Sequence, residues 1–187
     1  KMKFNKYAQS VNQTIIIFEG PDQCGKTEIG NKLSKILNIP YFKNDSERQG
    51  FKDDKDYFIN MLKYSDPFFL SYLRQSKSNV ILDRSFPSEY VYSKAFGRET
   101  DTEALKWVDE QYSKLNALII VCYRTKYTMD DDLCPERLNA KKLEEIDSLY
   151  REFSNTFTKC KVMFLNVDDE NITREVSDII KFMKEKC

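Results

Sequence analysis

The chain has 187 residues, of which 41% are hydrophobic, and this is enough for one domain with a core of useful size. Thirty basic residues balance thirty acidic ones, so no net charge draws the chain towards nucleic acid or an anionic membrane. Histidine is absent, which removes the commonest general base and leaves any proton transfer to carboxylates.

The cysteines and the hydropathy indicate an intracellular protein. The five cysteines have an odd count and no paired spacing, so we interpret them as free thiols in a reducing compartment. The N-terminus has no signal-like pattern, and no apolar run approaches the roughly 20 residues of a membrane span. We therefore expect a cytoplasmic location without a membrane partner, and a virus-encoded origin stays open.

Apolar runs and helical patterns alternate along the chain. Residues 1–13 are polar and weakly patterned, so we expect a short arm before the first strand. The predicted strands are Thr14–Phe18, Ile39–Phe42, Asn79–Asp83, Ala117–Tyr123 and Lys161–Val167. The predicted helices are Lys26–Leu37, Asp54–Gln75, Ser88–Phe96, Asp101–Leu115, Leu138–Thr158 and Ile172–Lys186. This alternation predicts one domain over residues 1–187, a three-layer α/β fold whose five-stranded parallel sheet has helices on both faces.

A glycine-rich sequence that matches a phosphate-binding pattern follows the first strand. Gly20-Pro-Asp-Gln-Cys-Gly25-Lys26-Thr27 fits G-x-x-x-x-G-K-[ST], and a helix-forming stretch comes directly after it. In such a P-loop the backbone N–H groups and the start of the helix hold a polyphosphate. Lys26 reaches the outer phosphates, and Thr27 offers its hydroxyl to Mg²⁺. We predict that ATP and Mg²⁺ bind here, with contacts from Gly20, Gln23, Cys24, Gly25, Lys26, Thr27 and Glu28.

A second charged motif ends the third predicted strand. Three apolar residues run into Asp83-Arg84-Ser85, and parallel strands present their carboxyl ends at the same edge of the sheet as the phosphate-binding loop. Asp83 is a candidate to hold Mg²⁺ through water, and Arg84 offers a planar fork that suits a phosphate. An internal salt bridge between Asp83 and Arg84 is the structural alternative, and the two roles are compatible.

Together these motifs resemble those of the thymidylate kinases. Phe18-Glu19-Gly20-x-Asp22 before the Gly-Lys pair is shared with that family, and so is Asp-Arg followed by a serine-containing helix. The resemblance covers most of the chain in order and spacing, and it implies a P-loop fold and phosphorylation of deoxythymidine monophosphate (dTMP) by ATP. Ser85, where thymidylate kinases usually carry Tyr, resembles the deoxynucleoside kinases instead. A deoxynucleoside kinase is therefore the nearest alternative.

The resemblance also implies roles for single residues. Asp22 would order the acceptor or the metal, while Lys26 and Arg84 would stabilise the charge on the phosphates. Glu19 would take a proton from the sugar hydroxyl of a nucleoside acceptor, or else would tie the loop to neighbouring backbone. The implied contacts with the acceptor come from Arg48, Phe69, Arg84, Ser88 and Tyr92.

The segment 124–137 has the composition of a lid. It is polar, contains Pro135, and interrupts the pattern of strands and helices after the fourth strand. Phosphoryl transfer is favoured by cations around the developing charge and by the exclusion of water, which a closing loop can supply. Arg124 and Lys126 are the catalytic candidates of this segment, with Arg137 third, and a plain solvated connection is the alternative.

Two further functions stay open at this point. One is a kinase that acts on a modified base within DNA, although the neutral net charge argues against nucleic acid as a partner. The other is a nucleotide-binding switch or assembly ATPase, a class that often carries a guanine-reading Asn-Lys-x-Asp motif absent from this sequence. We expect nucleotides as the main partners, and a homodimer is compatible with the sequence.

Overall fold

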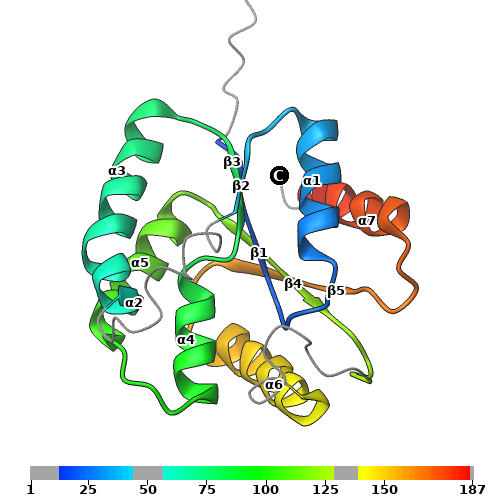
Figure 1. Ribbon diagram of the computed structural model, residues 1–187. Coiled ribbons are helices and arrows are strands. Elements are labelled where there is room, and N and C mark those ends of the chain that lie inside the picture. The colour runs from blue at the N-terminus through cyan, green and yellow to red at the C-terminus, as the bar shows by residue number, and fades with distance from the viewer. Residues whose placement is uncertain (1–12, 44–56, 129–138, 186–187) are drawn as a thin grey trace, which may run out of the picture.

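The computed structural model describes residues 13–43, 57–128 and 139–185, and five of its segments form one parallel sheet (Figure 1). The strands lie in the order β2-β3-β1-β4-β5, and each neighbouring pair is parallel. They are β1 (Ile15–Glu19), β2 (Tyr41–Lys43), β3 (Val80–Asp83), β4 (Leu118–Tyr123) and β5 (Lys161–Asn166). The predicted five-stranded parallel α/β fold is confirmed.

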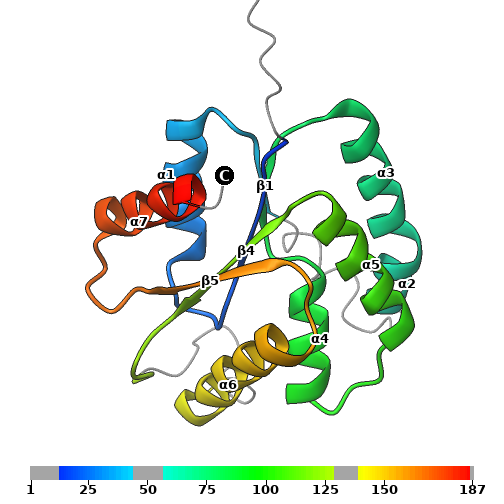
Figure 2. The same ribbon diagram turned by 180° about the vertical axis from the view of Figure 1, so that it is seen from behind.

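Helices cover both faces of this sheet. On one face α1 (Lys26–Leu37) packs against α7 (Ile172–Glu185), and Figure 2 shows the two side by side from behind. The other face carries α3, α4, α5 and α6, in which α4 contacts both α5 and α6. The bounds of the remaining helices are α2 (Tyr57–Asn60), α3 (Asp66–Ser76), α4 (Phe86–Ala95), α5 (Thr102–Lys114) and α6 (Ala140–Thr156).

One predicted helix, Asp54–Gln75, is helical throughout its described part, but one of its turns is π-helical and not α-helical. A π-helical segment, η2 (Met61–Ser65), separates α2 from α3, and the N–H of Asp66 donates to the carbonyl of Met61, five residues earlier. Pro67 explains the wider turn, because it has no N–H to donate and its ring crowds the carbonyl four residues before it. The first part of the predicted helix, residues 54–56, lies outside the described residues.

The central strands β1 and β3 are apolar up to their last residue, because helices cover both of their sides. Every residue of β1 is buried, and β1 lies between β3 and β4, where the chain changes from one half of the sheet to the other. Phe18 pairs with Asp83, and Glu19 pairs with Val121. The register therefore brings Glu19 and Asp83 to the carboxyl edge of the sheet, where α/β proteins usually bind ligands.

Helix α6 shows the predicted single buried face. Leu143, Ile146, Tyr150 and Phe153 are fully buried, and Phe153 and Tyr90 of α4 bring their rings to 5.2 Å between centroids. Over the residues that the structure describes, no helix combines the length and the hydropathy that crossing a membrane requires.

Candidate functional site

The loop between β1 and α1 has the backbone conformation that its glycines permit. Gly20 has a φ of 127°, and a Cβ atom there would lie 2.1 Å from the carbonyl oxygen of Cys122. Gln23 and Gly25 also have positive φ values, 65° and 63°. No side chain caps the start of α1 after Gly25, so the first N–H groups of this helix are available to an anion.

Lys26 lies folded back over this loop. Its Nζ donates to the carbonyl oxygens of Gly20 at 3.1 Å and of Pro21 at 2.6 Å, and the residue is buried. Burial lowers the pKa of Lys26, the nearby Arg84 lowers it further, and Asp22 opposes both. A phosphate in the loop would replace carbonyl oxygens with stronger, charged acceptors for the same ammonium group.

The two predicted metal ligands are in direct contact. The Thr27 hydroxyl donates to Oδ2 of Asp83 at 2.8 Å, and the Tyr41 hydroxyl donates to the same oxygen. Mg²⁺ usually takes one or two protein oxygens and keeps several waters, so this pair suits it. Within the described ranges, no three or more His, Cys, Asp or Glu side chains gather in a metal-holding group. Any bound Mg²⁺ would therefore need water and phosphate oxygens as well.

Arg84 is held by the loop and not by its neighbour in sequence. Its Nη2 donates to Oδ1 of Asp22, while the Tyr92 hydroxyl donates to Oδ2 of Asp22 at 3.2 Å. The guanidinium carbon lies 5.1 Å from the centre of the Tyr92 ring. Burial by itself would raise the pKa of Asp22, but Arg84 and Lys26 together lower it below its usual value, so this carboxylate stays ionised. Among the described ion pairs Arg84 contacts Asp22 and Glu19 and not Asp83.

Glu19 is fully buried and accepts three hydrogen bonds. Its Oε1 accepts from the N–H of Ser85 at 2.8 Å, and its Oε2 accepts from the Ser88 hydroxyl at 2.7 Å and the Tyr150 hydroxyl at 2.8 Å. Burial raises the pKa of Glu19, although Arg84 and these three donors oppose the rise. The carboxylate therefore ties the end of β1 to α4 and α6, and its role as a proton acceptor stays a prediction.

A first cavity, of about 320 Å³, lies beside the loop. Arg124 forms part of its wall, with Nε donating to the Gln23 carbonyl at 3.1 Å and Nη2 donating to Glu170 at 2.9 Å. The lining residues are Gln23, Gly25, Glu28, Ile29, Arg124, Val167, Glu170, Ile172 and Glu175.

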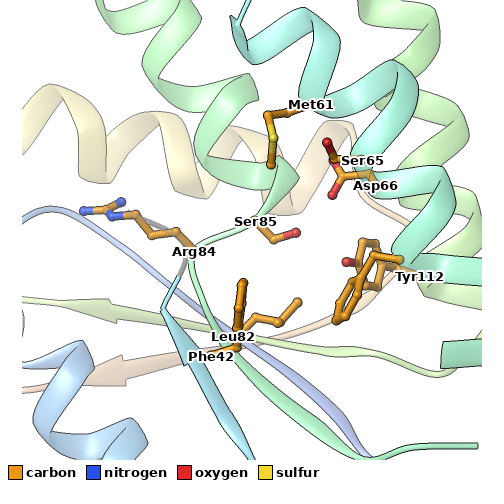
Figure 3. Close-up of a pocket in the computed structure, with 9 residues that line it drawn as sticks. Phe42, Met61, Ser65, Asp66, Leu82, Arg84, Ser85 and Tyr112 are labelled. Atoms are coloured by element: carbon orange, nitrogen blue, oxygen red, sulfur yellow. The ribbon is translucent and has the colours of Figure 1, made fainter. Parts of the chain in front are cut away.

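A second cavity, of about 170 Å³, lies on the other side of Arg84 (Figure 3). Phe69 belongs to its wall, and the rings of Phe69 and Phe42 are stacked with 6.5 Å between centroids. The lining residues are Phe42, Met61, Ser65, Asp66, Phe69, Leu82, Arg84, Ser85 and Tyr112. Arg84 therefore connects the loop, through Asp22, to this cavity.

Most of the predicted site residues are thus brought together at one edge of the sheet, with two differences. The Cys24 side chain is fully buried, with Sγ 3.9 Å from the Tyr127 hydroxyl, so only the backbone of Cys24 can reach a ligand. Arg48 and residues 129–137 of the predicted lid lie outside the described residues.

Several polar residues of the site were not predicted from the sequence, among them Tyr41, Asp66, Tyr112 and Tyr150. Tyr150 and Tyr112 lie at buried positions of amphipathic helices, which the helical periodicity predicts as core. Tyr41 lies in a strand, and Asp66 lies within the predicted long helix. The sequence Ser65-Asp66-Pro67 is typical of a helix start, and it was the available indication that the helical turn before Asp66 is irregular.

No family model matches the chain. In sequence it is similar to the SPbeta prophage-derived uncharacterized protein YorR of Bacillus subtilis (strain 168), at 28% identity over 144 residues, which is 74% of this chain and 81% of that protein. The structure of YorR in complex with phosphorylated GDP has a TM-score of 0.63 at 22% identity and covers 92% of this chain and 96% of that chain.

Two solved enzymes are also similar in structure. Thymidylate kinase from Ehrlichia chaffeensis has a TM-score of 0.58 at 16% identity and covers 92% of this chain and 99% of its own. Deoxyadenosine kinase from M. mycoides, with the products dCMP and dCDP, has a TM-score of 0.51 at 19% identity and covers 91% and 98%. The chain has the fold of the P-loop nucleoside and nucleotide kinases. Structural similarity at such low sequence identity establishes the fold alone, so any inference on activity has to come from the residues of the site.

Proposed function

We propose that the protein is a phosphotransferase that moves the γ-phosphate of ATP to a deoxynucleoside monophosphate. The observation that carries this proposal is the position of Arg84, which pairs with Asp22 of the phosphate-binding loop and also lines the second cavity. Arg84 thus runs from the wall of a cavity for an acceptor to a site for a donor phosphate, with its guanidinium pointing away from the cavity (Figure 3). A hydrolase would need a water-positioning group at this point instead of a second cavity.

The donor side uses the loop and the first cavity. The backbone N–H groups of the loop and Lys26 hold the phosphates of ATP, and the base occupies the cavity beside Gln23 and Arg124. Thr27 and Asp83 would hold Mg²⁺, which supplies positive charge between the donor phosphates.

The acceptor side uses the second cavity and the cluster around Arg84. The base lies in the cavity next to Phe69, and the acceptor phosphate lies at Arg84 in exchange for part of its contact with Asp22. Ser88 and Tyr92 surround this guanidinium and would support its orientation. Because an acceptor phosphate already carries an anionic oxygen, transfer can proceed in line without a general base.

The base of the acceptor is a separate question. The sequence resemblance makes dTMP the first acceptor to test, as one of the similar structures is a thymidylate kinase. Other similar structures contain phosphorylated GDP, or dCMP and dCDP. These ligands support a nucleotide as substrate. Because their bases differ, the preferred base has to be inferred from the residues that line the second cavity.

A deoxynucleoside kinase is the second candidate, and the surroundings of Glu19 favour it. A carboxyl group whose pKa burial raises, next to Ser88 and Arg84, can accept a proton from a sugar hydroxyl. The same geometry also fits a purely structural role, because all three hydrogen bonds of Glu19 come from the protein itself.

The two candidates respond differently to one pair of variants. If the acceptor is a monophosphate, Asp22→Asn should lower kcat by orders of magnitude, while Glu19→Gln should act mainly on stability. If the acceptor is a nucleoside, Glu19→Gln should lower kcat by about 10²–10⁴-fold. We would measure transfer from ATP to each deoxynucleoside and each monophosphate, with Glu103→Gln, an 83% exposed carboxyl on α5, as the control. Phosphorylation of unphosphorylated deoxynucleosides alone would overturn the monophosphate proposal.

A further inference from the structure

The second cavity contains polar groups that the protein does not pair. The Tyr112 side chain is fully buried, and its hydroxyl makes no hydrogen bond of normal geometry within the described part of the chain, although the Ser85 side chain lies close enough to lower its pKa. Asp66 lines the same cavity at the start of α3. Among the described residues, its carboxyl group has no ion-pair partner and no hydrogen-bond donor that lowers its pKa. Figure 3 shows Asp66, Ser85 and Tyr112 around one space, with Phe42 and Leu82 below them.

The Asp66 carboxyl group is costly to keep in this place. Burial alone raises the pKa of Asp66 to about 7, with no nearby positive charge acting against it. The other charged or titratable side chains on the wall of the cavity are Arg84, which is paired with Asp22, and Tyr112. A ligand that brings two hydrogen-bond donors would supply what the cavity lacks.

We infer that Asp66 selects a guanine as the base of the acceptor, by accepting hydrogen bonds from its N1–H and its N2 amino group. This inference rests on the proposed function and names the substrate class of that site. Guanine presents two adjacent donors on one edge and so matches both oxygens of a carboxylate. Thymine has a single ring N–H between two carbonyl oxygens, and adenine and cytosine place an amino group beside a bare ring nitrogen, so none of them offers a carboxylate two donors.

Tyr112 complements the remaining acceptor of that edge. Burial raises the pKa of Tyr112, so its hydroxyl stays protonated and can donate to O6 of guanine. The ring of Tyr112 is fixed by Phe86, which stacks on it with 5.5 Å between centroids and an angle of 14° between the planes. Apolar side chains of Phe42, Phe69 and Leu82 provide a surface for the flat faces of a base.

Binding measurements test the inference without relying on catalysis. We would titrate the full chain with dGMP, dTMP, dAMP and dCMP by calorimetry, in the wild type, in Asp66→Asn and in the control Glu103→Gln. We expect dGMP to bind the wild type about 10- to 100-fold more tightly than dTMP, the discrimination that a bidentate contact to a base provides. Asp66→Asn should remove most of this preference, and Glu103→Gln should keep it.

A pH series adds a second readout besides the preference among nucleotides. Because the ionised carboxylate is the form that accepts both donors, binding of dGMP should strengthen between pH 6 and pH 8. The difference between wild type and Asp66→Asn removes the titration of the nucleotide's own phosphate. Tighter binding of dTMP than of dGMP by the wild type would overturn the inference, and so would an unchanged preference in folded Asp66→Asn. Transfer assays then separate the two proposals, because guanine-selective binding without any transfer refutes the proposed function alone.

Discussion

Replacing Asp66 with Asn should stabilise the protein at neutral and alkaline pH. At a pH well below 3.8 the Asp66 carboxyl group is neutral in both the folded and the unfolded chain, so its burial costs no stability. As the pH rises from 3.8, the ordinary pKa of an aspartate, to about 7, the unfolded chain releases the proton of the Asp66 carboxyl group while the folded chain retains it. The free energy of unfolding therefore falls over this window, by about 1.4 kcal/mol per pH unit, and the loss is complete above pH 7.

The size of the effect follows from the shift in pKa. A pKa raised from 3.8 to about 7 corresponds to a loss of at most about 4 kcal/mol for the wild type at pH 8. Local relaxation and entry of water reduce this figure, so we expect Asp66→Asn to gain about 2–4 kcal/mol between pH 4 and pH 8 relative to wild type. In a chain of 187 residues this corresponds to roughly 4–16 °C in Tm.

Urea unfolding at pH 4, 5, 6, 7 and 8 measures this difference directly. Glu103→Gln is the matched control, since it makes the corresponding carboxyl-to-amide change at a side chain that is 83% exposed. If the difference in the free energy of unfolding between wild type and Asp66→Asn stays constant over this range, the Asp66 carboxyl group titrates alike in the folded and the unfolded chain. That result would refute the raised pKa. If the gain in stability appears together with a loss of dGMP binding, the carboxylate is kept for its ligand at the expense of stability.

Three further predictions concern the loop and Arg84. Lys26→Ala should remove phosphoryl transfer while the Tm stays within a few degrees, and more than about a tenth of wild-type kcat would contradict the role of this lysine. Arg84→Lys should be severely impaired because an ammonium group cannot reproduce two arms that contact Asp22 and Ser88, and normal turnover at saturating acceptor would make Arg84 structural. Gly20→Ala should destabilise the fold by about 3 kcal/mol or more, because its Cβ would lie 2.1 Å from a carbonyl oxygen. Gly97→Ala has open space around the new Cβ and should cost about 1 kcal/mol, the strain of a positive φ alone. Equal losses of Tm in the two variants would refute this contrast.

Local parts of the fold could be predicted from the sequence because their determinants lie within a few residues of each other. The apolar run of β1, the glycines of the loop and the start of α1 are contiguous, and the structure places them as predicted. The π-helical turn at η2 was missed although its cause, Pro67, is also local, because a single widened turn does not disturb the helical periodicity of the sequence enough to be seen.

The chemistry of the site depends on contacts that no local pattern encodes. Glu19 and Tyr150 are 131 positions apart, and Asp22 and Arg84 are 62 positions apart. The sequence by itself determined that a phosphate-binding loop would lie at the carboxyl edge of a parallel sheet, beside an Asp-Arg pair. Only the tertiary structure decided that Arg84 would pair with Asp22 and not with Asp83, and that Asp66 and Tyr112 would share a cavity. The reason is physical: hydrogen bonds and burial depend on distance in space, and the packing of α5 against α3 and η2 sets the distance between side chains that the sequence keeps far apart.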